Sequence, residues 1–160
     1  MRIRPLSDAD REWVGRLIVE RWGSGGVVGR GRVWDPGELP GFAAFEDERC
    51  VGLVTYELDG EACEVVTLDA LEEGRGIGTA LLRAVEDAAR EARCSRVQLL
   101  TTNNNLRALA LYQKRGYRLV GLVVGAIDEE RKLKPSIAEF DSAGLPIRDE
   151  LHLELALHGD

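Results

Sequence analysis

A glycine-rich turn between a β-like segment and a helical pattern is the part of the chain best suited to bind an anion. Gly74-Arg-Gly-Ile-Gly78 holds three glycines in five residues. It follows the β-rich run 51–68 and precedes an apolar pattern of helical period that extends to about Arg93. Such a turn directs free backbone N–H groups to one place, where the helix N-terminus adds partial positive charge. Phosphate is the usual anion there, so the turn predicts a phosphate site.

A second stretch that could take part in a reaction is a predicted helix that contains a tyrosine. Asn105 is a favoured N-terminal cap, residues 106–115 have the helical pattern, and Gly116 suits the C-terminal end. A phenol has a pKa of about 10 and is mostly protonated at neutral pH. Tyr112 can therefore donate a hydrogen bond or a proton to a reacting group. The alternative is an ordinary aromatic side chain packed on a sheet.

The elements that must position these two stretches predict a mixed α/β fold in one domain, residues 1–160. Strands are expected over 2–6, 27–34, 42–46, 50–58, 61–68, 95–101, 117–127 and 149–157, with an irregular segment over 128–146. A first helix begins after Ser7 and ends near Trp22. Asp59-Gly60 predicts a hairpin, so three antiparallel strands precede the glycine turn. The helix after that turn is a crossover, so its flanking strands should be parallel.

Composition restricts the classes of partner. A chain of 160 residues suits one domain, and a net charge of -7 argues against nucleic acid and is compatible with a cationic substrate. The longest apolar run, 119–127, is too short to span a bilayer, and the N-terminus lacks the apolar core of a signal peptide. We therefore expect a cytoplasmic protein with no membrane partner. The three cysteines lack metal-ligand spacing, so no metal site is expected.

Two motifs, separated by one helix and one strand, resemble those of the GNAT superfamily of N-acetyltransferases. Gly76 and Gly78 fit the family's glycine pattern, and Asn105, Ala108, Leu111, Tyr112, Gly116 and Tyr117 fit its second pattern. The resemblance covers residues 1–127. It implies a GNAT-like fold: a mostly antiparallel sheet, flanked by helices, whose central parallel strands splay apart to admit CoA. It also implies transfer of an acetyl group from acetyl-CoA to a primary amine, by direct attack in a ternary complex.

The resemblance further assigns residues to acetyl-CoA, the co-substrate. Its pyrophosphate would bind the turn and first helical residues, namely Gly74, Arg75, Gly76, Ile77, Gly78 and Thr79. The pantetheine arm would pair with the backbone from Val66 to Leu68, and Asn105 would hydrogen-bond the cofactor near the pantetheine. A backbone N–H near Leu68 would polarise the thioester carbonyl. Tyr112 would lie near the thioester sulfur and act as the general acid.

A general base is also required, because an amine with a pKa of about 10.4 arrives mostly protonated. Glu64 is the first candidate, since it lies on the strand that would flank the cofactor, and Asp69 at the end of that strand is the second. A chain of water molecules to either group remains open. For both residues the alternative is a solvated hairpin carboxylate without a catalytic role.

Glu73 departs from the family, which usually has Arg or Gln at this position. A carboxylate directed at a pyrophosphate would repel it, so we expect this side chain to face solvent while Arg75 supplies positive charge. The departure also supports a second hypothesis, an acyl-CoA-binding sensor or interaction domain with little catalysis. The acceptor, a small-molecule or protein amine, stays open, as do the acyl chain and a homodimer. Segments 23–31 and 128–146 are expected to shape the acceptor pocket.

Overall fold

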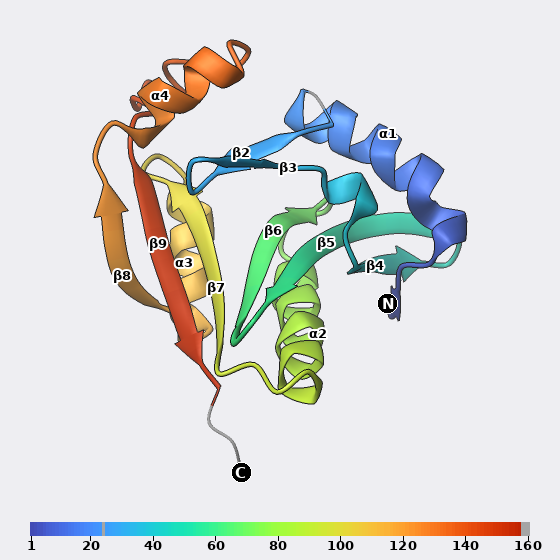
Figure 1. Ribbon diagram of the computed structural model, residues 1–160. Coiled ribbons are helices and arrows are strands. Elements are labelled where there is room, and N and C mark those ends of the chain that lie inside the picture. Colours follow the sequence, from blue (N-terminus) through green and yellow to red (C-terminus); the bar gives the residue numbers. More distant parts are fainter. Residues whose placement is uncertain (24, 158–160) are drawn as a thin grey trace.

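The computed structural model describes residues 1–23 and 25–157, and within them a mixed α/β domain with two sheets (Figure 1). The larger sheet has seven strands in the order β1-β4-β5-β6-β7-β9-β8. Its strands are β1 (Arg2–Pro5), β4 (Gly41–Glu46), β5 (Arg49–Asp59), β6 (Ala62–Ala70), β7 (Arg96–Thr102), β8 (Arg118–Val123) and β9 (Glu150–Ala156). The helices are α1 (Arg11–Trp22), α2 (Ile77–Glu91), α3 (Leu106–Lys114) and α4 (Ala126–Leu133). The expected fold class is confirmed. Among the described residues, no helix is long and apolar enough to cross a membrane.

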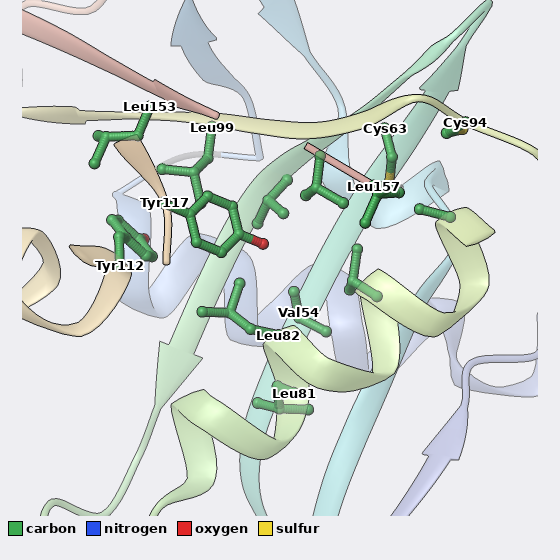
Figure 2. Close-up of a cluster of buried hydrophobic side chains, with 14 of the residues drawn as sticks. Val54, Cys63, Leu81, Leu82, Cys94, Leu99, Tyr112, Tyr117, Leu153 and Leu157 are labelled. Carbon is green, nitrogen blue, oxygen red and sulfur yellow. The ribbon is translucent and has the colours of Figure 1, made fainter. Parts of the chain in front are cut away.

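Helices cover both faces of the large sheet. On one face, α2 and α3 enclose the main core, where Leu81, Leu82 and Val85 are fully buried (Figure 2). On the other face, α1 contributes Val14 and Ile18 to a smaller apolar cluster. Because apolar area removed from water stabilises a fold by roughly 25 cal/mol per Å², these two clusters fix the helices on the sheet. The central strands of the sheet therefore lie between α2 and α3 on one face and α1 on the other.

The central parallel pair separates along its length. Strands β6 and β7 are in register only at Ala62↔Arg96, Cys63↔Val97 and Glu64↔Gln98, although both strands continue beyond these residues. Past this point β6 pairs with β5 alone, and β7 pairs with β9. Figure 1 shows the two strands diverging towards the ends that precede α2 and α3. The predicted parallel pair and its splay are therefore confirmed.

A β-bulge lies where the strands diverge. Thr55 opposes Thr67 and the next residue, Tyr56, opposes Val65, so Val66 has no partner on β5. A bulge turns the strand and leaves the extra residue outside the ladder. Backbone groups of β6 therefore become accessible at the start of the opening between β6 and β7.

Two segments differ from the expected elements. The predicted strand over 27–34 is a hairpin, β2 (Val27–Gly29) and β3 (Arg32–Trp34). Its turn residues Arg30 and Gly31 both have positive φ, +50° and +71°, as a two-residue hairpin turn requires. The other difference is in 117–133: β8 ends at Val123, Gly125 takes a φ of +75° and α4 begins. The continuous apolar run 119–127 concealed this change, because its last residue, Ile127, is a buried residue of α4 and does not belong to the strand.

Candidate active site

The glycine turn presents unpaired backbone donors. Gly74 and Gly76 have φ values of +73° and +70°, and Gly76 caps α2 without a side-chain hydrogen bond. The first α2 amide bonded to a helix carbonyl is that of Ala80, 3.0 Å from Gly76 O. Within residues 1–23 and 25–157, no acceptor lies against the amides of 74–79. A β-carbon added at either glycine would meet open space. The turn can therefore receive an anion, as predicted from the sequence.

A cleft of about 610 Å³ runs from this turn into the opening between β6 and β7. Its walls come from both diverging strands, from the start of α2 and from α3. The predicted cofactor-binding residues that line it are Val66, Leu68, Gly74, Arg75, Gly76, Ile77, Gly78, Thr79 and Asn105. Tyr112 lines it as well. The fold thus brings to one cavity two motifs that are separated in the chain by α2 and β7.

Tyr112 lies deep in the cleft, on the side of α3. Its side chain is 7% exposed and its ring packs against Tyr117, with ring centroids 6.0 Å apart (Figure 2). In the part of the chain that is described, no group forms a hydrogen bond with its hydroxyl. Burial, and then the charge of Asp69, raises the pKa of Tyr112 to about 12. The phenol is therefore protonated at neutral pH and free to donate to a ligand.

Asp69 approaches the same cleft from the end of β6. Trp22 Nε1 donates to its Oδ2 at 3.1 Å, and Arg21 Nε lies 3.5 Å from its Oδ1. These contacts fix the carboxylate against the last turn of α1. Burial raises the pKa of Asp69, and the contacts with Trp22 and Arg21 oppose that rise. A carboxylate with a raised pKa is better suited to accept a proton at neutral pH than an exposed one.

Glu64, the first candidate base, has different surroundings. It is 4% exposed, forms an ion pair with Arg30 and accepts a hydrogen bond from Gln98 Nε2 at 3.0 Å. It does not line the cleft that contains Tyr112. Burial raises the pKa of Glu64, and the hydrogen bond from Arg30 is the largest opposing effect. Its catalytic role remains a prediction, whereas Asp69 lies in the cleft itself.

The family model for the acetyltransferase (GNAT) family matches residues 12–117. The chain belongs to this family. It is 42% identical over 154 residues to the uncharacterized protein YxbD of Bacillus subtilis (strain 168), covering 96% of this chain and 97% of the relative. The fold is similar to that of the IAA acetyltransferase from Bacillus cereus ATCC 14579, with a TM-score of 0.74, 21% identity and coverage of 98% and 99%. It is also similar to a GNAT family acetyltransferase from Elizabethkingia anophelis with acetyl-CoA bound, with a TM-score of 0.70, 18% identity and coverage of 98% and 97%.

Glu73, the residue at which this GNAT protein departs from the family pattern, lies at the exposed rim of the cleft. The Glu73 side chain is 71% exposed and forms an ion pair with Arg107. Arg75 contacts Glu72 at 2.6 Å and also pairs with Glu46, so its charge is shared with two carboxylates. Exposed pairs of this kind contribute little and exchange easily with solvent ions. The free amides are therefore the main anion-binding feature of the turn.

The far half of the cleft contains residues that the sequence did not single out. It is lined by Trp22 from the end of α1, by Val28 from β2, and by Glu130 and Lys134 in and after α4. Lys134 Nζ donates to the carbonyls of Trp22 and Gly26, which fixes the end of α4 against the start of the hairpin. Residues from both segments expected to shape the acceptor pocket, 23–31 and 128–146, therefore line the cleft, although Ser24 lies outside the described residues. Their role in binding an acceptor stays a prediction. The helical arrangement of α4 was needed to find Glu130.

Proposed function

We propose that this protein transfers the acetyl group of acetyl-CoA to a primary amine by direct attack in a ternary complex. The observation that supports it most directly is the cleft between β6 and β7, which joins the free amides of 74–79 to the Tyr112 hydroxyl. A phosphate-bearing, elongated acyl donor matches the shape and chemistry of that cleft. The related Elizabethkingia anophelis structure contains acetyl-CoA, which supports the same donor here.

The residues present suit each part of acetyl-CoA. The amides of 74–79 would bind the pyrophosphate. Among the described residues, the β6 edge that faces β7 has no strand partner beyond Glu64, so Val66 and Leu68 offer backbone groups to the pantetheine amides. Asn105 Oδ1 caps α3 by accepting from Ala108 N at 3.2 Å, which leaves its amide N–H groups for the pantetheine. A backbone N–H near Leu68 would stabilise the oxyanion.

The proposed reaction needs one proton acceptor and one donor. The amine lone pair attacks the thioester carbon, the C–N bond forms, and the C–S bond breaks as the tetrahedral intermediate collapses. Asp69, directly or through water, would take the proton from the amine nitrogen, because it lines the cleft. Glu64 would serve only through water, since Arg30 and Gln98 occupy its carboxylate. Tyr112 would donate a hydrogen bond to the departing sulfur, which leaves as the CoA thiolate.

The alternative, a sensor domain with little catalysis, receives no support from Glu73, whose side chain is exposed. A free-thiol release assay with acetyl-CoA and a panel of amines distinguishes the two functions. The proposed enzyme releases CoA in proportion to amine consumed. A sensor binds acetyl-CoA in calorimetry without amine-dependent thiol release. Absence of binding at millimolar acetyl-CoA would overturn both.

We also propose that β8 pairs with β8 of a second copy to form a homodimer. Strand β8 is an edge of the sheet, and it exposes Leu119, Val120, Leu122 and Val123 by 44 to 57%. Exposed apolar edge strands invite pairing with another chain unless they are protected. Antiparallel self-pairing would satisfy the edge hydrogen bonds and cover these side chains under one twofold axis.

A further inference from the structure

A buried carboxyl pair lies at the far end of the cleft. Glu130 of α4 is 7% exposed and Glu150 of β9 is 2% exposed, and Glu150 lies close enough to raise the pKa of the Glu130 carboxyl. Glu150 also accepts from the backbone N–H of Arg30 at 3.1 Å and contacts His152 Nε2 at 3.1 Å. Across the described residues, Glu130 forms no ion pair with Lys, Arg or His. Its carboxyl is thus buried without a cationic partner.

Glu130 is shared by two cavities. It lines the cleft described above and also a second cavity of about 660 Å³, whose walls include Arg30, Leu133 and His152. Val28 is shared in the same way, so the two cavities adjoin at Val28 and Glu130. The carboxyl therefore faces space that a ligand can reach. A ligand that extends from Tyr112 along the cleft would meet Glu130 at this junction.

The surroundings of Glu130 suit an alkyl chain that ends in a cationic nitrogen. Apolar side chains next to it in the two cavities are Val28, Ile127, Leu133 and Ile137. Burial, and then the charge of Glu150, raises the pKa of Glu130 to about 7. A buried carboxylate without a partner is costly, and a cation that supplies hydrogen bonds removes that cost. Lys134 does not fulfil this role, because its ammonium binds the carbonyls of Trp22 and Gly26.

We propose that Glu130, supported by Glu150, binds a second cationic nitrogen of the acceptor, so that the acceptor is an aliphatic diamine or polyamine rather than a simple monoamine. The inference rests on the proposed acetyl transfer and specifies its acceptor. The reacting amine would lie near Asp69 and Tyr112, and the distal ammonium would lie at the cavity junction. Glu130 is then a specificity-determining residue that touches the substrate away from the reacting atoms.

The test compares α,ω-diamines with n-alkylamines of equal chain length as acceptors. A charge-assisted hydrogen bond predicts a KM for the best diamine that is lower by about 10- to 100-fold, with similar kcat. Glu130→Gln should abolish that preference by raising the KM for the diamine to that for the monoamine of equal length, without changing the KM for acetyl-CoA. Asp128→Asn is the matched control, because it removes a carboxylate of the same helix whose side chain is 58% exposed and pairs with Arg131. It should retain the diamine preference.

The remaining outcomes distinguish failure of the diamine site from failure of acetyl transfer. Equal KM values for diamines and monoamines, or an unchanged preference in Glu130→Gln, would refute the inference and leave acetyl transfer standing. If no amine is acetylated, calorimetric titration of the CoA-loaded protein with diamines still tests the site. Binding that Glu130→Gln abolishes would then support the site and refute the transfer, and no binding would refute both. If Glu130→Gln does not fold, the comparison of acceptors with the unaltered protein decides.

Discussion

Replacing Tyr112 by Phe should distinguish the contribution of its hydroxyl from that of its ring. The ring packs against Tyr117, and the hydroxyl forms no hydrogen bond with any described residue. Phe preserves the packing and removes only the donor. We therefore expect the fold and the affinity for acetyl-CoA to be retained, with the thermal midpoint changed by no more than a few degrees. The loss should be in the chemical step.

The pKa of the phenol sets the size of that loss. Burial and Asp69 raise the pKa of Tyr112 to about 12, whereas a thiol has a pKa of about 8.5. At about 1.4 kcal/mol per pH unit, complete proton transfer to the departing thiolate is uphill by about 5 kcal/mol. Tyr112 should therefore stabilise the sulfur mainly as a hydrogen-bond donor. Such a charge-assisted bond contributes about 1.5–3 kcal/mol, so kcat should fall by about 10- to 150-fold.

Free-thiol release at saturating acetyl-CoA and amine measures this directly. The KM for acetyl-CoA should stay within about twofold of the unaltered value. The lost hydrogen bond is one made to the departing sulfur in the transition state and not to bound acetyl-CoA. Tyr117→Phe is the matched control: it removes a hydroxyl from the same ring pair, but that hydroxyl donates to Glu86 at 3.1 Å. It should lower stability and leave kcat nearly unchanged. An unaltered kcat in Tyr112→Phe would refute the assignment of this hydroxyl to the sulfur.

Three further predictions concern the base, the core and the edge strand. Asp69→Asn should lower kcat/KM by about 100-fold or more, with a smaller effect from Glu64→Gln. Because burial raises the pKa of Asp69, the acid limb of the pH profile of kcat/KM should lie above the usual aspartate range near pH 3.9, with activity rising as the group loses its proton. Glu86→Ala should lower the free energy of unfolding by about 1–3 kcal/mol in urea titrations, because it leaves the buried Tyr117 hydroxyl without its acceptor and the half-buried Arg115 without its partner. Leu122→Lys should convert a dimer to a monomer in light scattering.

Three results would contradict these predictions for the base, the core and the edge strand. A larger loss in Glu64→Gln than in Asp69→Asn would move the base to Glu64 and require water to connect it with the amine. An unchanged urea midpoint for Glu86→Ala would show that Arg115 and the Tyr117 hydroxyl find other partners. If the unaltered protein is a monomer, pairing through β8 is wrong before any substitution is made.

The glycine turn and the helix α3 could be predicted from the sequence because they depend on local backbone chemistry. Glycines that require positive φ, an asparagine cap and helical periodicity are readable without tertiary contacts, and they located Gly74–Gly78, Asn105 and Tyr112. The parallel arrangement of β6 and β7 followed from the crossover helix. These features are local or topological, and the structure places them in one cleft.

The part of the cleft that contains Glu130 was less predictable because it depends on contacts between distant segments. The apolar run that begins in β8 continues to Ile127, so it concealed the start of α4 and with it the position of Glu130. Glu64 and Asp69 lie on the same strand, and only the partners Arg30 and Trp22 distinguish them. Periodicity alone cannot report which partner a carboxylate meets. Glu86 was missed for the same reason, since its partners lie 29 and 31 residues away.

The central claim is that the cleft between β6 and β7 carries an acetyl group from CoA directly to an amine. The most direct measurement follows one reaction mixture over time, with free CoA thiol measured by absorbance and N-acetylated amine by mass spectrometry. Direct transfer predicts equal amounts of free CoA and N-acetylated amine, formed only when amine is present. It also predicts no acetylated protein before amine is added. Saturable binding of acetyl-CoA without amine-dependent formation of both products would contradict it.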